Sequence, residues 1–303
     1  MPAEPAVPRR CGVVALLGAP NAGKSTLTNA LVGQKVAIVS PRVQTTRQRL
    51  TGIAIEGPAQ LLLVDTPGLF QPRRRLDRAM VQSAWEGAAD ADLLLAIVDS
   101  RAGLKPDSRD LLAALTRRTG ARWLVLNKVD AADKAGLLAL AAEANALGHF
   151  DRTFMVSALT GDGVADLKSA LAAAMPEGPW LFPEDQLSDA PQRLMASELV
   201  REQLFLQLGQ ELPYASAVVV EKFEERADGS AAVHAQILVE RDSQKAIVLG
   251  AKGARIRAIG EAARREMEAL LERRVHLFLH VKTRPGWAED RHSWRDLGLD
   301  WVE

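Results

Sequence analysis

The stretch Gly18-Ala19-Pro20-Asn21-Ala22-Gly23-Lys24-Ser25 stands at the end of a short apolar run, residues 13–18. It fits the pattern G-x-x-x-x-G-K-[ST], in which glycines let backbone N–H groups approach phosphate oxygens, a lysine reaches the β- and γ-phosphates, and a hydroxyl ligates Mg²⁺. The alternative is a structural glycine turn between a strand and a helix. The pattern predicts a phosphate-binding loop, and the residues expected there are Gly18, Asn21, Ala22, Gly23, Lys24, Ser25 and Thr26, with Ser25 on Mg²⁺.

Outward from this loop, short apolar runs alternate with helical patterns as far as about residue 175. This alternation is typical of βαβ units, and continuously apolar strands indicate a sheet covered on both faces. We therefore expect an α/β domain with a mostly parallel sheet and helices on both faces. The predicted strands are residues 13–18, 50–57, 61–65, 93–99, 123–127 and 153–158.

Three further motifs fall at the ends of predicted strands, where open α/β sheets bind ligands. Asp65-Thr66-Pro67-Gly68 can hold Mg²⁺ through water at Asp65 and contact a γ-phosphate at Gly68. Asn127-Lys128-Val129-Asp130 places a carboxylate that can accept two hydrogen bonds from guanine, and the wrong base would leave this acceptor unpaired. Ser157-Ala158-Leu159 offers the Ala158 N–H to the guanine carbonyl. Four motifs in this order predict a guanine-nucleotide site.

The motifs resemble those of the translation-factor-like GTPases. Ras-like GTPases have a glutamine after the Asp-x-x-Gly motif to orient the attacking water, whereas this chain has Leu69. The resemblance to the subgroup with a hydrophobic residue there implies slow unassisted hydrolysis and a K⁺ site at Asn21. The polar segment 41–48 is the predicted first switch, in which Thr46 is favoured over Thr45 as the Mg²⁺ ligand.

Four prolines between residues 175 and 191 exclude a helix or a central strand, and we place the domain boundary there, with domains 1–180 and 181–303. The second domain reads αββααβ. It has a predicted helix over 192–209, strands over 215–225 and 230–242, helical segments over 244–249 and 254–272, and a last strand over 274–282. It is an α+β domain.

Gly250-Ala251-Lys252-Gly253 lies between the two helical segments 244–249 and 254–272. A bare G-x-x-G can be only a turn between helices, but in this order of elements it resembles the type II K-homology domain. That resemblance implies close approach of an RNA backbone to the loop. The residues expected to bind RNA are Gly250, Ala251, Lys252, Gly253, Arg255, Ile256 and Arg257. The alternative for the three cations is a solvated helix start.

The chain balances 38 Lys and Arg against 38 Asp and Glu over 303 residues, so its net charge does not favour a nucleic-acid partner. The charge is segregated, however. Residues 245–274 hold eight basic and four acidic side chains, which form a modest basic patch around the loop 250–253. RNA binding that uses this patch should have a shallow salt dependence. A lone cysteine and the lack of an apolar run of about 20 residues predict an unexported protein without a membrane span.

The pairing of one GTPase domain with a C-terminal K-homology domain is similar to the Era family of bacterial GTPases. That resemblance implies GTP/GDP and Mg²⁺ as cofactors and the 3′ end of small-subunit ribosomal RNA and the 30S subunit as partners. It also implies a monomer that acts in small-subunit assembly, in the cytoplasm or peripherally at the inner face of the cell membrane. No DNA partner is expected. The alternatives are an RNA-binding assembly module with negligible GTP turnover, and a P-loop ATPase or nucleoside kinase.

Overall fold

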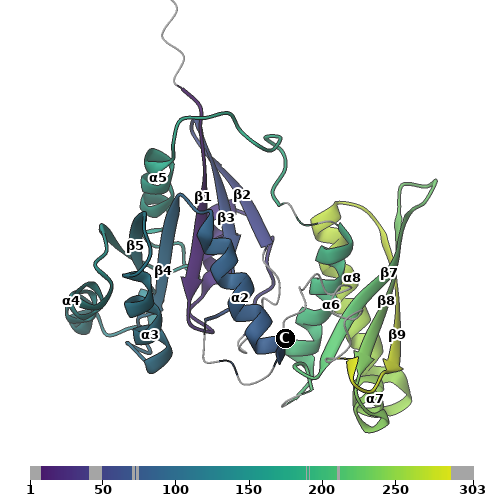
Figure 1. Cartoon of the computed structure of the whole chain (residues 1–303). Coiled ribbons are helices and arrows are strands. Elements are labelled where there is room, and N and C mark those ends of the chain that lie inside the picture. The colour runs from purple at the N-terminus through teal and green to yellow at the C-terminus, as the bar shows by residue number, and fades with distance from the viewer. Residues whose placement is uncertain are drawn as a thin grey trace, which may run out of the picture. The chain divides into compact units, whose positions relative to one another are not determined.

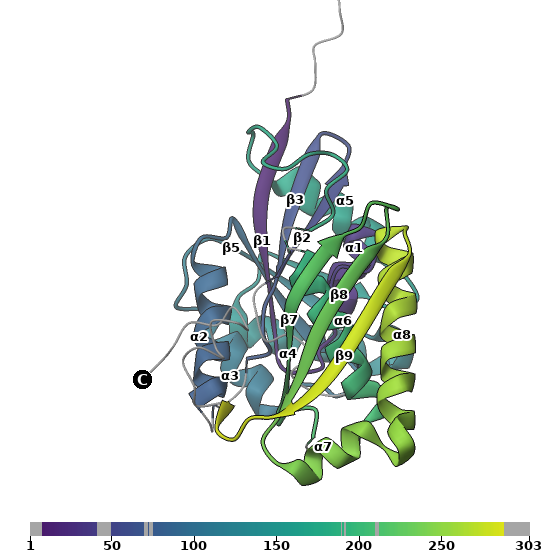
Figure 2. The ribbon, with the colours of Figure 1, turned by 90° about the vertical axis from the view of Figure 1, so that its right-hand side faces the viewer.

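The computed structural model describes residues 8–40, 50–69, 72, 75–188, 190, 192–209 and 212–287. The chain divides into two compact units, and the main part of the second begins at Ala190. Figures 1 and 2 show a sheet with helices on both faces in the first unit and a smaller sheet backed by helices in the second.

The first unit is built around a six-stranded sheet in the order β2-β3-β1-β4-β5-β6. Only β2 is antiparallel to its neighbour, and the other pairs are parallel. The strands are β1 (Arg10–Gly18), β2 (Leu50–Glu56), β3 (Ala59–Asp65), β4 (Leu93–Asp99), β5 (Ala121–Asn127) and β6 (Arg152–Val156). All six predicted strands are confirmed.

Alternate residues of the central strands serve two separate cores. One contains Leu16 and Val125 and is covered by α1 (Lys24–Val32) and α5 (Val164–Ala174). The other contains Leu17 and Leu126 and is covered by α2 (Arg75–Ala89), α3 (Pro106–Leu115) and α4 (Leu137–Gly148). Burial on both faces explains why these strands read as unbroken apolar runs.

A buried side chain of the first unit binds the middle of the proline-rich linker. Gln60 of β3 is fully buried; its Oε1 accepts hydrogen bonds from the N–H groups of Leu181 (2.8 Å) and Phe182 (3.1 Å), and its Nε2 donates to Phe182 O (2.9 Å). Further along, Ile53 N donates to Leu187 O at 2.8 Å. Residues 181–188 thus belong to the first unit, and the division lies just before Ala190, later than the predicted boundary after residue 180.

The second unit has the predicted order αββααβ. Its elements are α6 (Gln192–Gln207), β7 (Ser216–Glu225), β8 (Ala231–Val239), α7 (Asp242–Leu249), the 3₁₀ turn η3 (Ala251–Gly253), α8 (Ala254–Leu271) and β9 (Val275–Thr283). The sheet order is β7-β8-β9, with β7 and β8 antiparallel and β8 and β9 parallel. Figure 2 shows α6 and α8 behind one face of this sheet.

The last described residue of the second unit is Trp287, which is fully buried and donates from Nε1 to Ala215 O at 3.2 Å. This tryptophan therefore packs within the domain. Across the described ranges, no helix has both the length and the apolar character needed to cross a membrane.

Replacing Gln60 by Leu should destabilise the first unit, because an apolar side chain leaves two N–H groups and one carbonyl of the linker without their partners. We expect a loss of about 2–4 kcal/mol in the free energy of unfolding, measured by denaturant titration, and faster proteolysis between residues 176 and 188. The control is Gln82→Leu on the exposed surface of α2. Equal stability of the two variants would show that Gln60 does not hold the linker.

Candidate functional site

The loop between β1 and α1 curls tightly enough to present its backbone to an anion. Asn21 and Gly23 both adopt left-handed conformations, with φ of 62° and 93°. A Cβ atom on Gly23 would collide with the Asn127 side-chain amide, so only glycine fits there. Helix α1 begins at Lys24, so its N-terminal N–H groups and positive dipole end point to the same place.

Lys24 is folded back over this loop. Its ammonium group donates to the carbonyl oxygens of Gly18 (3.0 Å) and Ala19 (3.3 Å), and its side chain is almost completely buried. Burial lowers the pKa of Lys24 from 10.5 to about 8, and the nearby negative charge of Asp65 acts in the opposite direction. A phosphate beside the ammonium group would favour the charged form and raise this pKa.

Ser25, in the first turn of α1, and Asp65, the last residue of β3, place two buried oxygen atoms side by side. The Ser25 hydroxyl donates to Asp65 Oδ2 at 2.7 Å. Hydroxyl and carboxylate oxygens are the ligands that Mg²⁺ prefers, and Mg²⁺ usually keeps several waters when it binds beside phosphates. The pair therefore fits a magnesium ion, with Ser25 as a direct ligand and Asp65 acting through water.

Asn127 connects three of the four motifs through its side chain. Its Nδ2 donates to Ala22 O at 2.9 Å, and its Oδ1 accepts from the N–H groups of Lys128 (2.8 Å) and Ala158 (3.0 Å). The side chain is buried. One carboxamide thus holds the phosphate loop, the loop after β5 and the loop after β6 together.

Lys128 makes a second connection to the phosphate loop. It lies in a left-handed conformation, and its ammonium group donates to Asn21 O and to Asp99 Oδ2, the latter at 2.7 Å. Asp99, the last residue of β4, is part of this cluster, although the motifs alone do not reveal it. Its place at the carboxyl end of a central parallel strand is the signal that could have identified it.

The remaining residues predicted to bind guanine lie around this cluster. Asp130 is exposed in the short turn Val129–Ala131, which leaves its carboxylate accessible. Ser157 is buried, and its hydroxyl accepts from Thr160 N at 3.1 Å, so this side chain shapes the loop. Leu159 is 80% exposed. The Ala158 N–H points at Asn127 Oδ1, so a guanine carbonyl would share this donor.

The loop after β3 packs directly on the phosphate loop. A Cβ atom on Gly68 would lie 2.9 Å from backbone atoms of Pro20, and Leu69 N donates to Gly18 O at 3.0 Å. The Leu69 side chain is buried in the core beneath α2, where it cannot orient a water molecule. The candidate switch threonines Thr45 and Thr46 lie outside the described residues.

In the second unit, the Gly250–Gly253 turn separates α7 from α8 without continuing either helix. Lys252 is left-handed with φ of 50°. A Cβ atom on Gly250 would lie 2.7 Å from Arg255 Cβ, whereas one on Gly253 would meet nothing within 4 Å. Arg255 donates to Ile247 O at 2.9 Å and Arg257 to Lys252 O at 3.2 Å, so both arginines brace the turn while remaining exposed.

A groove of about 480 Å³ opens beside this turn, between α8 and β9. Its floor contains Ile256, Leu277 and Leu279, and its rim carries Arg257, Glu261 and Arg264. The sequence predicted Gly253, Ile256 and Arg257 here. The β9 side chains and Arg264 were missed, although alternation along the strand and four-residue steps along the helix could have indicated them. An apolar floor suits unstacked bases, and a rim on which two arginines outnumber one glutamate suits a small number of phosphates.

Fold and site together define a P-loop guanine-nucleotide-binding protein with a K-homology module. The family described as "50S ribosome-binding GTPase" matches residues 13–128, and the KH domain family matches residues 211–288.

Curated relatives extend the likeness over almost the whole chain. GTPase Era of Brucella suis is 56% identical over 96% of this chain and 94% of its own, and that of Rhizobium meliloti is 57% identical over 97% and 94%. The chain therefore belongs to the Era family of GTPases, and it is a GTPase.

Solved structures of this family agree with the fold. A variant of Aquifex aeolicus Era bound to GDP and AlF₄⁻ has a TM-score of 0.90 and 34% identity, covering 95% of this chain and 99% of that one. Era in complex with MgGDPNP and nucleotides 1506–1542 of 16S ribosomal RNA also has a TM-score of 0.90 and 34% identity, covering 96% and 99%.

Replacing Asn127 by Ala should destabilise the first unit even when no nucleotide is bound. It removes three hydrogen bonds and leaves buried backbone groups unpaired, so we expect the free energy of unfolding to fall by about 2–4 kcal/mol. Denaturant titration of the nucleotide-free protein measures this change. The matched variant is Asp130→Asn, which should leave stability unchanged and shift preference from GTP to xanthosine triphosphate. If Asn127→Ala weakened only nucleotide binding, the carboxamide would not be a structural clamp.

Proposed function

We propose that this GTPase is a switch that couples guanine-nucleotide hydrolysis to binding of the 3′ end of small-subunit ribosomal RNA during assembly of the 30S subunit. The observation that carries the proposal is that one chain holds both the Asn127-centred nucleotide cluster and an open G-x-x-G turn beside an apolar groove. A glycine turn or an apolar groove by itself would indicate no particular function. Their presence together in a chain of this family favours a nucleotide-controlled RNA binder.

In the nucleotide site, groups of the chain hold the triphosphate and stabilise the negative charge on it. The loop N–H groups and Lys24 hold the phosphates, and Ser25 and Asp65 hold Mg²⁺, which neutralises charge that develops on the phosphates. Asp130 selects guanine. No side chain acts as a general base in this proposal, because phosphoryl transfer depends mostly on positioning and electrostatic stabilisation.

Negligible turnover is disfavoured because the chain belongs to a family of GTPases and keeps the buried Lys24, Ser25 and Asp65. An ATPase or nucleoside kinase is disfavoured by the exposed carboxylate of Asp130 beside the Asn127 cluster. Adenine could not supply the two donors that such a carboxylate accepts.

The RNA partner is proposed from the groove and from one relative. An Era structure with 34% identity holds nucleotides 1506–1542 of 16S ribosomal RNA. The groove here offers Ile256, Leu277 and Leu279 to bases, while Lys252 and Arg257 stand exposed at the turn. With few cations at its rim, affinity should come mainly from base contacts, and its salt dependence should be shallow. DNA is not proposed as a partner.

We place the protein in the cytoplasm as a monomer that associates peripherally with the inner face of the membrane. These three assignments rest on the properties implied by the family. Sedimentation of the purified protein, and fractionation of cells before and after a high-salt wash, would test them.

Replacing Gly253 by Asp should block RNA without disturbing packing, because a side chain there enters open space beside the groove. We expect affinity for an oligonucleotide that spans nucleotides 1506–1542 of 16S ribosomal RNA to fall about ten- to a hundredfold, since the carboxylate repels the phosphate backbone. Fluorescence anisotropy measures the affinity, and GTP hydrolysis without RNA should not change.

The matched control is Gly229→Asp, in the β7–β8 turn. Gly229 also has a positive φ, 80°, and open space around it, so both variants carry the same backbone strain. If both variants bound the oligonucleotide as tightly as the unaltered protein, the groove would not be the RNA site.

We also propose that Asn21 contributes to a K⁺ site that replaces the charge and orientation a glutamine supplies in Ras-like GTPases. Asn21 lies exposed in a left-handed conformation at the tip of the phosphate loop. Hydrolysis should then be about tenfold or more faster in KCl than in NaCl of equal concentration, because a fixed positive charge stabilises the transition state. Asn21→Ala should abolish the difference, while Asn145→Ala on α4 should keep it. Equal rates in both salts would disprove this role.

A further inference from the structure

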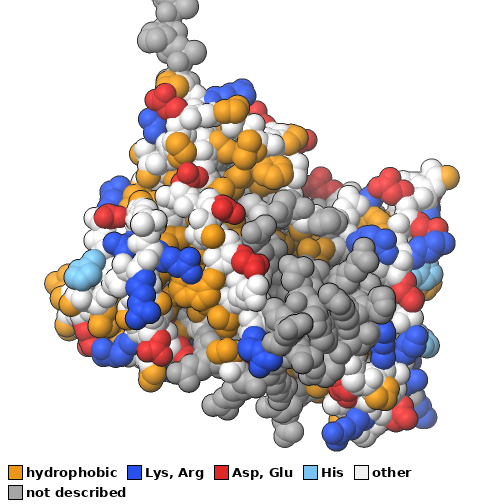
Figure 3. All heavy atoms as spheres, in the orientation of Figure 1, with side chains coloured by type: hydrophobic (Ala, Val, Ile, Leu, Met, Phe, Trp, Pro, Cys, Tyr) orange, Lys and Arg blue, Asp and Glu red, His pale blue; other side chains and the backbone are white. Residues whose placement is uncertain are grey.

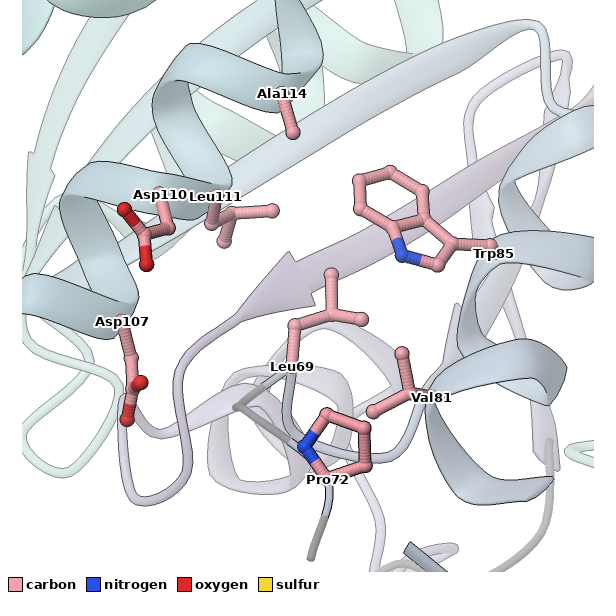
Figure 4. Close-up of a pocket in the computed structure, with 8 residues that line it drawn as sticks. All are labelled: Leu69, Pro72, Val81, Trp85, Asp107, Asp110, Leu111 and Ala114. Carbon is pink, nitrogen blue, oxygen red and sulfur yellow. The ribbon is translucent and has the colours of Figure 1, made fainter. Parts of the chain in front are cut away.

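A second pocket, separate from the nucleotide and RNA sites, lies between α2 and α3 of the first unit and has a volume of about 220 Å³. Figure 4 shows Leu69 pointing upward between the two helices, with Val81 and Trp85 on the α2 side and Leu111 on the α3 side. Figure 3 shows hydrophobic side chains gathered on this face. The pocket is smaller than typical sites for drug-sized ligands, which measure about 300–1,000 Å³, so it suits a single anchoring side chain.

Two carboxylates stand on the α3 side of this pocket. Asp107 and Asp110 are one helical turn apart and lie at the α3 edge of the pocket (Figure 4). Neither makes an ion pair with any residue that the structure describes, whereas their neighbour Arg109 pairs with Glu143 of α4. A cation brought next to Asp107 and Asp110 would therefore find two acceptors that the described part of the chain does not use.

Charged groups of opposite sign lie at opposite ends of the pocket. Beyond the carboxyl end of α3, the Arg118 guanidinium lies 4.8 Å from the centroid of the Trp85 ring. The two aspartates lie near the amino end of the same helix. An occupant with a positive charge next to its apolar part would be oriented with that charge toward the aspartates, and phosphates of RNA would be repelled there.

We propose that this pocket docks a segment of a partner protein that inserts one large apolar side chain between Leu69 and Trp85 and places an adjacent lysine or arginine against Asp107 and Asp110. The apolar lining supplies the anchoring surface, and the paired carboxylates supply selectivity. This proposal rests on the nucleotide half of the proposed function and is independent of the RNA target.

The floor of the pocket connects this docking to the nucleotide. Leu69 donates its backbone N–H to Gly18 O, and the preceding Gly68 packs on Pro20 of the phosphate loop. A partner that contacts the Leu69 side chain therefore touches a residue tied to the loop that holds phosphates. Any preference of the partner for one nucleotide state must be matched by an equal effect of the partner on nucleotide affinity.

The chemistry of the pocket can be tested with a defined probe, N-acetyl-leucyl-arginine amide, added to the full chain in the GDP state. Saturable methyl NMR shifts should appear at Val81 and Leu111. The charge-reversed probe N-acetyl-leucyl-glutamate amide should bind about fivefold more weakly or less, and Asp107→Asn with Asp110→Asn should reduce affinity for the arginine probe by a similar factor. Asp166→Asn, in the first turn of α5, is the matched control and should have no effect.

The class of partner can be tested in cells with a photo-crosslinking amino acid at Ala114, which lines the pocket, and at Ala113, which is exposed on the same helix and does not. We expect protein crosslinks from position 114 only, mapped to peptides with an apolar residue beside a lysine or arginine and lost in the double asparagine variant. GTP hydrolysis by that variant should be unchanged, which shows that the fold is intact.

Three results would overturn the proposal. They are crosslinks from position 114 to RNA, equal crosslinks from both positions, and binding of the two dipeptides with equal affinity. Loss of oligonucleotide binding in Gly253→Asp with crosslinks intact would leave the proposal standing, since the two sites are tested separately.

Discussion

The nucleotide half of this protein depends on the carboxamide of Asn127. Its side chain joins three loops that follow different strands of the sheet. The carboxamide has one donor and one acceptor face, and both are used, by Ala22 O on one side and by the N–H groups of Lys128 and Ala158 on the other. An aspartate could not donate to Ala22, and a glutamine would be one methylene too long for the buried space. Asn127 belongs to the motif that recognises the base, but its side chain holds the three loops together.

The clamp works because the sheet delivers all three loops to one edge. β1, β5 and β6 are mutually parallel through β4, so their carboxyl ends meet. Lys128 adds a second, charged bridge from the same place to Asn21 and Asp99. Asn127 and Lys128 both bind backbone carbonyls of the phosphate loop. A movement of the base-binding loop therefore also displaces the loop that binds the phosphates.

Much of this arrangement could be predicted from the sequence. The strands were predictable because burial on both faces leaves unbroken apolar runs, and the motifs because glycines, Lys24 and Asp130 rarely occur at that spacing without a nucleotide to bind. Gln60 was not predictable, since a glutamine inside an apolar strand gives no sign that its partners, Leu181 and Phe182, lie far away along the chain. The boundary placed after residue 180 was early for the same reason: proline composition marks where secondary structure stops, and long-range hydrogen bonds decide where the linker packs.

The pocket between α2 and α3 escaped prediction for a related reason. Asp107 and Asp110 are ordinary first-turn and surface residues of an amphipathic helix, and nothing in their spacing indicates what faces them across the gap.

Leu69 shows most clearly how one position can serve two purposes. A glutamine at this position in Ras-like GTPases orients water, and it must reach the phosphate to do so. Here the backbone of Leu69 stays tied to Gly18 while its side chain turns into the core and reaches the α2–α3 pocket. With leucine at this position, the side chain contacts the core and the α2–α3 pocket, and not the phosphate. A residue that cannot act on the attacking water still connects the α2–α3 pocket to the phosphate loop, because its side chain lines the pocket and its backbone N–H is bonded to Gly18.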